Sequence, residues 1–359
     1  MNPYKAAIAI AAASLVITLS ATGWTAPVTP PPAQSATLTQ PEPATAPPQF
    51  VPCTRVATIY NERPAFRLSD GKTAAIIVPS IGRVMFYGLV GGANQLWNAP
   101  PKSATNGGWY NYGGDKTWAA PQDNWLELTG RTWPPYDNWD GTPHKTETLR
   151  NGALRTTSQN SPTSGVRCIR EYGFDAMGGF VISQVFEKLS GAPVTMSIWS
   201  ITQVPTPDAV YLRRALDSPY TNGYYGFRSG GKAPLLDVAP VGADLLRLRP
   251  TTQGQTKIGL DSPVSGLVAL RGGIAFVQRA AKPRGNYPDG ASGAGFPVEI
   301  YHNPQPAYSE LELLSPLQLY KPGNKVRHTV TWHLFKLPDA DATSPQAAQF
   351  AAEQLQAAQ

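Results

Sequence analysis

Charge, cysteine and histidine are all scarce in this chain. Charged residues make up 15% of its 359 positions, and only two cysteines and four histidines occur. The histidines are scattered, without the short spacings of metal ligands, and neither a G-x-S-x-G nucleophile elbow nor a phosphate-binding P-loop is present. We therefore expect no metal site and no cofactor.

Basic residues form no run of five or more, although the net charge is +6. The densest places, RLRP and RCIR, hold two arginines each. A nucleic-acid-binding protein usually concentrates its lysines and arginines on one stripe. We expect no nucleic-acid partner, and we expect the protein to act as a monomer.

The chain has one long hydrophobic run, AAIAIAAASLVITL, which is too short to span a bilayer. It follows Lys5, and Ala21 and Gly23 supply the small residues of a cleavage site. We interpret positions 1–23 as a signal peptide, and we expect a periplasmic or secreted protein with no membrane span. Positions 24–50, rich in Pro, Ala and Thr, are typical of an extended linker.

The two cysteines are Cys53 and Cys168. In an oxidising compartment two cysteines most simply form one disulfide, and the alternative is a pair of buried free thiols. The export signal favours the disulfide, which we predict.

The rest of the composition favours strands. Gly (33) and Pro (36) are abundant and disfavour long helices, whereas aromatic residues at 10% favour sheets. Short apolar runs bounded by turn residues follow one another without alternating helices; examples are TAAIIVP, GRVMFYGLV and PVTMSIWSIT. We predict an all-β protein, a large antiparallel β-sandwich over 51–338. In the tail, 339–359, Ser344 and Pro345 are suited to begin a short helix.

One polar-aromatic segment, NYGGDKTWAAPQDNW at 111–125, differs from the strands around it. Gly and Pro interrupt it, so we interpret it as a loop, and loops often carry function. A sugar site needs an aromatic platform and polar groups for the hydroxyls. The residues suited to these roles are Asp115, Lys116, Trp118, Gln122 and Trp125, with Gly113 and Gly114 letting the backbone approach closely. Alternatively, the indoles fill the loop's own small core and Asp115–Lys116 is a surface pair.

Three segments together resemble the galactose mutarotase-like superfamily. They are GRVMFYGLVGG, NYGGDKTWAAPQ and YSELELLSPLQLYKPGNKVRHTVTWHLF, and the resemblance covers roughly 54–337. It is strongest to an exported bacterial branch of that superfamily. The resemblance implies a β-supersandwich, two twisted antiparallel sheets with a sugar-binding cleft on the concave face.

The resemblance also implies a catalytic base. Mutarotases of this kind use a Glu on a late strand, before a Pro-Gly turn and a closing strand. The corresponding segment is SELELL, so the base would be Glu312 or Glu310, and Glu312 is the closer match. The two lie on one side of a strand, with Leu311 and Leu313 on the other. A strand with two outward Glu is also commonly just a solvated face.

The acid half of an acid–base pair is not identified by the sequence. The family's His, followed by a short Gly-containing segment and an Arg, has no counterpart; the candidates are His302 and His144. Arg83 on an early strand could reach the cleft, or it could cover a sheet edge.

Three functions are open at this point. The first is an exported carbohydrate-binding protein with a mutarotase-like sugar cleft and no catalysis. The second is a sugar-active enzyme, an epimerase or mutarotase or a carbohydrate-cleaving relative, with Glu312 as general base. The third, suggested by the Pro-rich linker, is an envelope scaffold protein.

Overall fold

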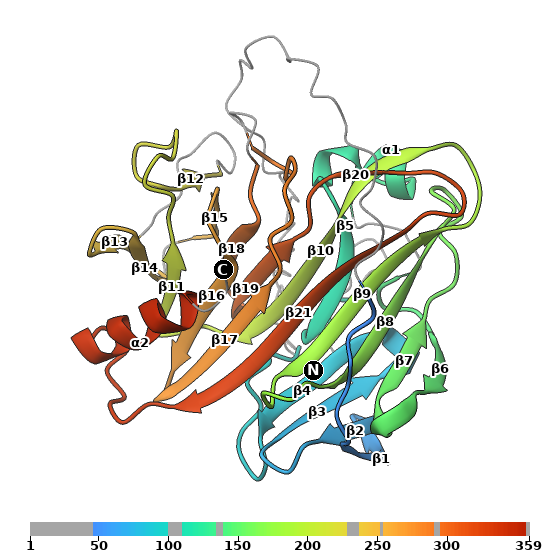
Figure 1. Ribbon diagram of the computed structural model, residues 1–359, viewed down its shortest axis with the longest axis horizontal. Helices are drawn as coiled ribbons and strands as arrows, with labels where there is room; N and C mark the ends of the chain where they lie inside the picture. Colours follow the sequence, from blue (N-terminus) through green and yellow to red (C-terminus); the bar gives the residue numbers. More distant parts are fainter. Residues whose placement is uncertain are drawn as a thin grey trace, which may run out of the picture.

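Two large antiparallel sheets face each other in the computed structural model (Figure 1). The structure describes residues 46–99, 110–133, 139–227, 237–251, 254–290 and 295–356. The predicted signal peptide and most of the predicted linker lie outside these residues. The predicted all-β sandwich is confirmed.

The first sheet has 11 strands, in the order β1-β2-β3-β4-β5-β10-β19-β18-β15-β12, with β20 also paired to β10. Their bounds are β1 Thr54–Tyr60, β2 Arg63–Ser69, β3 Thr73–Val78, β4 Arg83–Leu89, β5 Asp115–Ala120, β10 Val194–Pro205, β12 Tyr225–Gly226, β15 Thr256–Leu260, β18 Val298–Pro304, β19 Ala307–Leu314 and β20 Gln318–Tyr320.

The second sheet has 10 strands, in the order β13-β14-β11-β16-β17-β21-β9-β8-β7-β6. Their bounds are β6 Lys145–Thr148, β7 Leu154–Thr157, β8 Val166–Phe174, β9 Phe180–Lys188, β11 Ala209–Arg213, β13 Asp237–Val241, β14 Leu245–Arg249, β16 Ser265–Arg271, β17 Ile274–Ala280 and β21 Lys325–Lys336.

The main core lies between the two sheets. Alternation along each strand puts every second side chain on this inner side. The first sheet supplies, among others, Ile300, Leu311 and Leu313, and the second supplies Val330 and Trp332. Burial of this apolar surface is the principal force that holds the sheets together.

Helices are few and short in the described part of the chain. They are α1 Trp125–Thr129, α2 Pro345–Gln356 and three single-turn 3-10 helices at Pro79–Ile81, Gln122–Asn124 and Arg150–Gly152. The Ser344 hydroxyl accepts a hydrogen bond from the Ala347 amide at 3.2 Å, which caps α2. Small and apolar side chains of α2, among them Ala351 and Leu355, pack on the outer face of the second sheet. No helix among these residues is both apolar and long enough to cross a membrane.

The interpretation of 111–125 as a loop is wrong for most of its length. Asp115–Ala120 is β5, in the middle of the first sheet, and a 3-10 turn and α1 follow it. The segment DKTWAA alternates between the two faces, and the flanking Gly and Pro mark its ends. Gly113 and Gly114 have φ of +83° and +72°, as expected from the close backbone approach there.

The predicted disulfide is also wrong, because Cys53 and Cys168 are both free thiols. Cys53 precedes β1 and lies against the Asn151–Gly152 turn, where its amide donates to the Asn151 carbonyl at 2.9 Å. Cys168 points from β8 into a separate apolar cluster with Phe186. An even cysteine count carries no geometric information, and here the two thiols occupy different clusters.

Candidate functional site

A band of polar and aromatic side chains crosses the middle of the first sheet on the face away from the main core. Residues paired directly across antiparallel strands share a face. The register pairs Lys116 with Ile201, Ile201 with Glu312, and Glu312 with Glu299. This band, here called the charged face, consists of Lys116 and Trp118 on β5, Trp199 and Gln203 on β10, Glu310 and Glu312 on β19, Glu299 and Tyr301 on β18, and Lys257 on β15.

The charged face is buried despite its charges. Lys116, Trp118, Trp199, Glu299 and Glu312 are all at most 3% exposed. Burying a charge is costly unless it is paired, so a fold rarely gathers several such groups on one sheet face for stability alone. Such clusters are typical of functional sites.

Lys257 is the centre of one half of the charged face. Its Nζ lies 2.6 Å from Glu299 Oε2 and 3.3 Å from Glu312 Oε2. The same ammonium lies 4.5 Å from the ring centroid of Trp199, a cation–π distance. The Trp199 indole donates to Glu312 Oε2 at 2.9 Å. Glu312 is therefore held by two donors on one oxygen.

Burial and charge pull the pKa values of this group in different directions. Burial raises the pKa of Glu312 and raises that of Glu299 well above its ordinary value, although Lys257 opposes both shifts. Burial alone would lower the pKa of Lys257, but Glu299 and Glu312 raise it above the usual range. Lys257 is a fixed positive charge, and the two carboxyls hold protons more tightly than carboxyls in water.

Lys116 and Glu310 form the other half. Lys116 Nζ lies 3.0 Å from Glu310 Oε1, to which the Gln203 amide also donates at 2.9 Å. The Lys116 ammonium lies 4.1 Å from the Trp118 ring centroid. Burial lowers the pKa of Lys116, and Glu310 only partly offsets it. The Glu310 side chain is 13% exposed, so this half lies nearer to solvent than Glu312 does.

Arg83 holds one end of the charged face without belonging to it. Arg83 Nε donates to Asp140 Oδ1 at 2.5 Å, and Arg83 Nη2 donates to Asp140 Oδ2 at 2.6 Å. Arg83 Nη1 donates to the Gly113 carbonyl at 2.7 Å. Asp140 Oδ2 also accepts a hydrogen bond from the Trp118 indole N–H at 2.9 Å. Burial would raise the pKa of Asp140, but Arg83 lowers it below the ordinary value. Arg83 therefore acts on the site through Asp140 and Trp118, and its positive charge also helps to lower the pKa of Lys116.

Aromatic rings border the charged face next to Glu310. Trp97 and Tyr308 stack with ring centroids 4.6 Å apart, and Tyr301 lies 6.1 Å from Tyr308. Trp97 and Tyr301 are half-buried, so their rings remain accessible. Flat aromatic surface beside hydrogen-bonding groups is the combination that a sugar ring requires.

The other candidates from 111–125 are not members of the charged face, although Trp125 packs against its Trp118 and Trp199. Asp115 points between the sheets, where it contacts Arg170 and accepts the Thr202 hydroxyl at 2.9 Å. Trp125 is fully buried beneath Trp118, with ring centroids 5.1 Å apart. Gln122 is half-buried in the 3-10 turn after β5.

All four histidines are among the described residues, and none lies on the charged face. His302 follows Tyr301 on β18 and so points to the opposite side, where its nitrogens contact Ser309 Oγ at 3.0 Å and the Thr251 carbonyl at 2.9 Å. Burial lowers the pKa of His302. His328 and His333 belong to β21 of the second sheet.

His144 lies near the Arg83 end but outside the charged face. Its Nε2 is 3.1 Å from the Trp139 carbonyl, and burial together with Arg170 lowers its pKa to about 4. It is therefore neutral at physiological pH and is held by the backbone.

Five residues at the site were not predicted from the sequence: Lys257, Glu299, Trp199, Gln203 and Trp97. A signal was present for the first two, because TKIGL and PVEIY each place one charged residue among apolar ones in a strand. Such a position predicts a charge that is paired inside the fold. The pairing of Lys257 with Glu299 could not be predicted from the sequence, because β15 and β18 are far apart in the chain and become neighbours only in the folded sheet.

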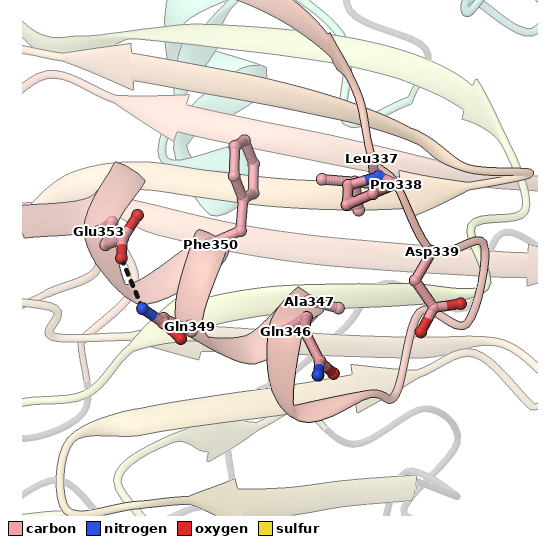
Figure 2. Close-up of a pocket in the computed structure, with 8 residues that line it drawn as sticks. All are labelled: Leu337, Pro338, Asp339, Gln346, Ala347, Gln349, Phe350 and Glu353. Carbon is pink, nitrogen blue, oxygen red and sulfur yellow. Dashed lines mark hydrogen bonds between the residues drawn. The ribbon is translucent and has the colours of Figure 1, made fainter.

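Two hollows in the described part of the molecule lie away from the charged face. One is a groove of about 200 Å³ between α2 and the segment after β21, lined by Leu337 and Phe350 among others (Figure 2). The other, of about 10 Å³, adjoins His302. Within the described ranges, no group of three or more His, Cys, Asp or Glu side chains is placed to hold a metal ion.

Comparisons with known proteins identify the fold. No family model matches the chain, and no curated protein matches it. Among solved structures, a protein of Escherichia coli provisionally named an aldose 1-epimerase superposes with a TM-score of 0.53 at 13% identity, over 76% of this chain and 99% of that one. One of the same provisional name from Klebsiella pneumoniae gives 0.53 at 11% identity, over 85% and 87%. A provisionally named mutarotase from Salmonella typhimurium gives 0.50 at 10% identity, over 80% and 97%. The chain has the galactose mutarotase-like fold.

Proposed function

We propose that this protein is an exported carbohydrate-binding protein and that the charged face is its sugar site. The observation that carries the proposal is the gathering of two lysines, three glutamates and two tryptophans on one face of one sheet. Paired charges supply directed hydrogen bonds to hydroxyls, and aromatic rings supply surface for the C–H faces of a sugar.

The sugar is expected to enter at the Glu310 end. Glu310, Tyr301 and Trp97 keep part of their surface accessible, whereas Glu299 and Glu312 lie deeper. A sugar hydroxyl can take hydrogen bonds from Lys116 and give one to Glu310. A sugar ring that packs on the accessible rings of Trp97 and Tyr301 is held in the same orientation.

Sugar-active catalysis is the second candidate, and one observation favours it. Glu312, the residue that the resemblance implies as the base, has a pKa raised by burial and lies beside a second carboxyl. A carboxyl whose pKa approaches the working pH is suited to proton transfer. The solved neighbours provisionally named aldose 1-epimerases are consistent with such an activity.

Calorimetric titration with a panel of mono- and oligosaccharides tests the binding proposal. We expect at least one saccharide to bind the wild type, and Glu310→Gln to weaken that binding because the neutral amide no longer forms an ion pair with Lys116 and has one acceptor oxygen fewer for a sugar hydroxyl. Glu147→Gln is the matched control, since Glu147 is exposed on β6 of the other sheet. If no saccharide binds, or if both variants bind equally to wild type, the proposal fails.

Export is a separate part of the proposal. It is supported by the apolar run and small residues before position 24. Mass spectrometry of the protein from its native host is expected to find a mature chain that begins near Trp24. An intact N-terminus in the soluble fraction would contradict export.

A further inference from the structure

Glu299 and Glu312 face each other across two neighbouring strands. They are directly paired in the β18–β19 register, and both are 0% exposed. Lys257 contacts both, at 2.6 and 3.3 Å. One ammonium therefore serves two fully buried carboxyls.

The charge around Lys257 does not balance when all groups are ionised. Asp289, a partly buried residue on the segment before β18, lies within hydrogen-bond reach of Glu299. Lys116 is engaged by Glu310. Three carboxylates around the one ammonium of Lys257 would leave a net charge of −2. Uncompensated buried charge costs several kcal/mol, and uptake of a proton relieves it.

The other titratable groups nearby do not supply the missing positive charge. Burial raises the pKa of Tyr301 and Tyr308 above the ordinary value, so both stay neutral. Burial likewise raises the pKa of Asp289. The balance must be restored on the carboxyls themselves.

The hydrogen-bond pattern indicates that the proton lies between Glu299 and Glu312. Within the described part of the chain, Oε1 of Glu299 and Oε1 of Glu312 have no hydrogen-bond partner, and Oε2 of Glu299 contacts the Lys257 ammonium at 2.6 Å. The two carboxyls lie within hydrogen-bond reach of each other. A proton on Glu299 makes it a donor to Glu312, whose Oε2 already accepts from Trp199.

We propose that Glu299 and Glu312 share one proton at neutral pH and that Glu299 is the proton donor of the sugar site. The second part rests on the proposed sugar function. It assigns the acid role to a carboxyl on a face that holds no histidine.

The arrangement suits the anomeric centre of an aldose, where the hydroxyl oxygen and the ring oxygen are bonded to the same carbon. Glu312 takes the hydroxyl proton, and the O–H electron pair forms the carbonyl. The bond from that carbon to the ring oxygen breaks, and the electron pair released on the ring oxygen takes the proton of Glu299. Closure of the ring on the other side of the carbonyl returns both protons.

Isotope-edited infrared spectroscopy tests the shared proton without any sugar. Labelling the glutamate carboxyls with ¹³C separates them from Asp115 and Asp289. We expect the full chain at pH 7 to show a protonated glutamate band that is lost in Glu299→Gln and retained in Glu310→Gln. A wild-type spectrum without the band, or a band that persists in Glu299→Gln, would overturn the inference.

Addition of D-galactose or D-glucose tests the donor role. A sugar that binds by calorimetry should shift the Glu299 band, and where polarimetry shows accelerated mutarotation, Glu299→Gln should slow it by about 10²–10⁴-fold with binding retained. A bound sugar that leaves the band unchanged would overturn the donor role. Failure of a full saccharide panel to bind would contradict the sugar function, while the band still decides whether the proton is shared.

Discussion

Replacement of Lys257 by Met tests whether the charged face is held together by its central ammonium. The substitution keeps an unbranched side chain of similar length but removes the ammonium, which lies 2.6 Å from Glu299, 3.3 Å from Glu312 and above the rings of Trp199 and Phe227. Removing one partner of a buried ion pair typically costs about 3–5 kcal/mol, because the other partner is left uncompensated. At about 2–4 °C per kcal/mol, Tm should fall by roughly 6–20 °C at pH 7.

The pH dependence makes this prediction specific. Burial raises the folded-state pKa of Glu299 and Glu312, so the folded protein binds protons more tightly than the unfolded chain. Stability from these groups is therefore full below the ordinary Glu pKa of about 4.3 and is lost as the pH rises toward their raised values. Lys257 opposes that loss, so the variant should differ little from wild type near pH 4 and most at pH 7.

Differential scanning calorimetry of the variant and the wild type at pH 4 and pH 7 measures the fall in Tm and its dependence on pH. Lys72→Met, at an exposed position in the turn before β3, is the control and should leave Tm within about 2 °C. A Lys257→Met variant as stable as this control at pH 7, or one equally destabilised at both pH values, would refute the reasoning.

Three further predictions concern other parts of the molecule. Glu312→Gln should abolish turnover of any sugar that the wild type processes while binding is kept, and Glu310→Gln should be milder in turnover; full turnover by Glu312→Gln would show that the base lies elsewhere. Gly114→Ala should lower the free energy of unfolding, measured by chemical denaturation, by about 2–4 kcal/mol, because its Cβ would lie 2.2 Å from the Val84 carbonyl oxygen at a φ of +72°. Gly71→Ala is the control, since Gly71 has a φ of +91° but open space around it, and it should lower that free energy by less; equal losses in the two variants would contradict the clash. Labelling of the denatured, unreduced protein should find two reactive thiols, and labelling of the native protein should spare the buried Cys168; a result of no thiols would restore the disulfide.

The strands, and the face of the strand on which each side chain lies, could be predicted from the sequence because both depend on the local alternation of polar and apolar residues. SELELL placed Glu310 and Glu312 on one side and Leu311 on the other, and the structure has them so. The Trp-rich segment was misread because Gly and Pro outweighed the alternation of DKTWAA. Its Gly pair immediately precedes strand β5.

Which side chains of the charged face contact one another could not be predicted from the sequence, because these contacts depend on the pairing of strands that are distant in the chain. Lys257 meets Glu312 only because β15, β18 and β19 are neighbours in the sheet. The alternation of residues along a strand predicts the face on which each side chain lies, but not which strand pairs with it. The cysteine prediction was wrong for the same reason, since Cys53 and Cys168 were paired by number alone.

Titration of the ¹⁵N-labelled protein with a bound saccharide, followed through the indole N–H resonances, tests the sugar site most directly. The indoles of Trp199 and Trp118 donate to Glu312 and Asp140, whereas Trp332 lies in the core between the sheets and is an internal reference. We predict that the Trp199 and Trp118 resonances shift with saccharide concentration while that of Trp332 does not. Saturable binding that leaves Trp199 and Trp118 unchanged would contradict the placement of the site on the charged face.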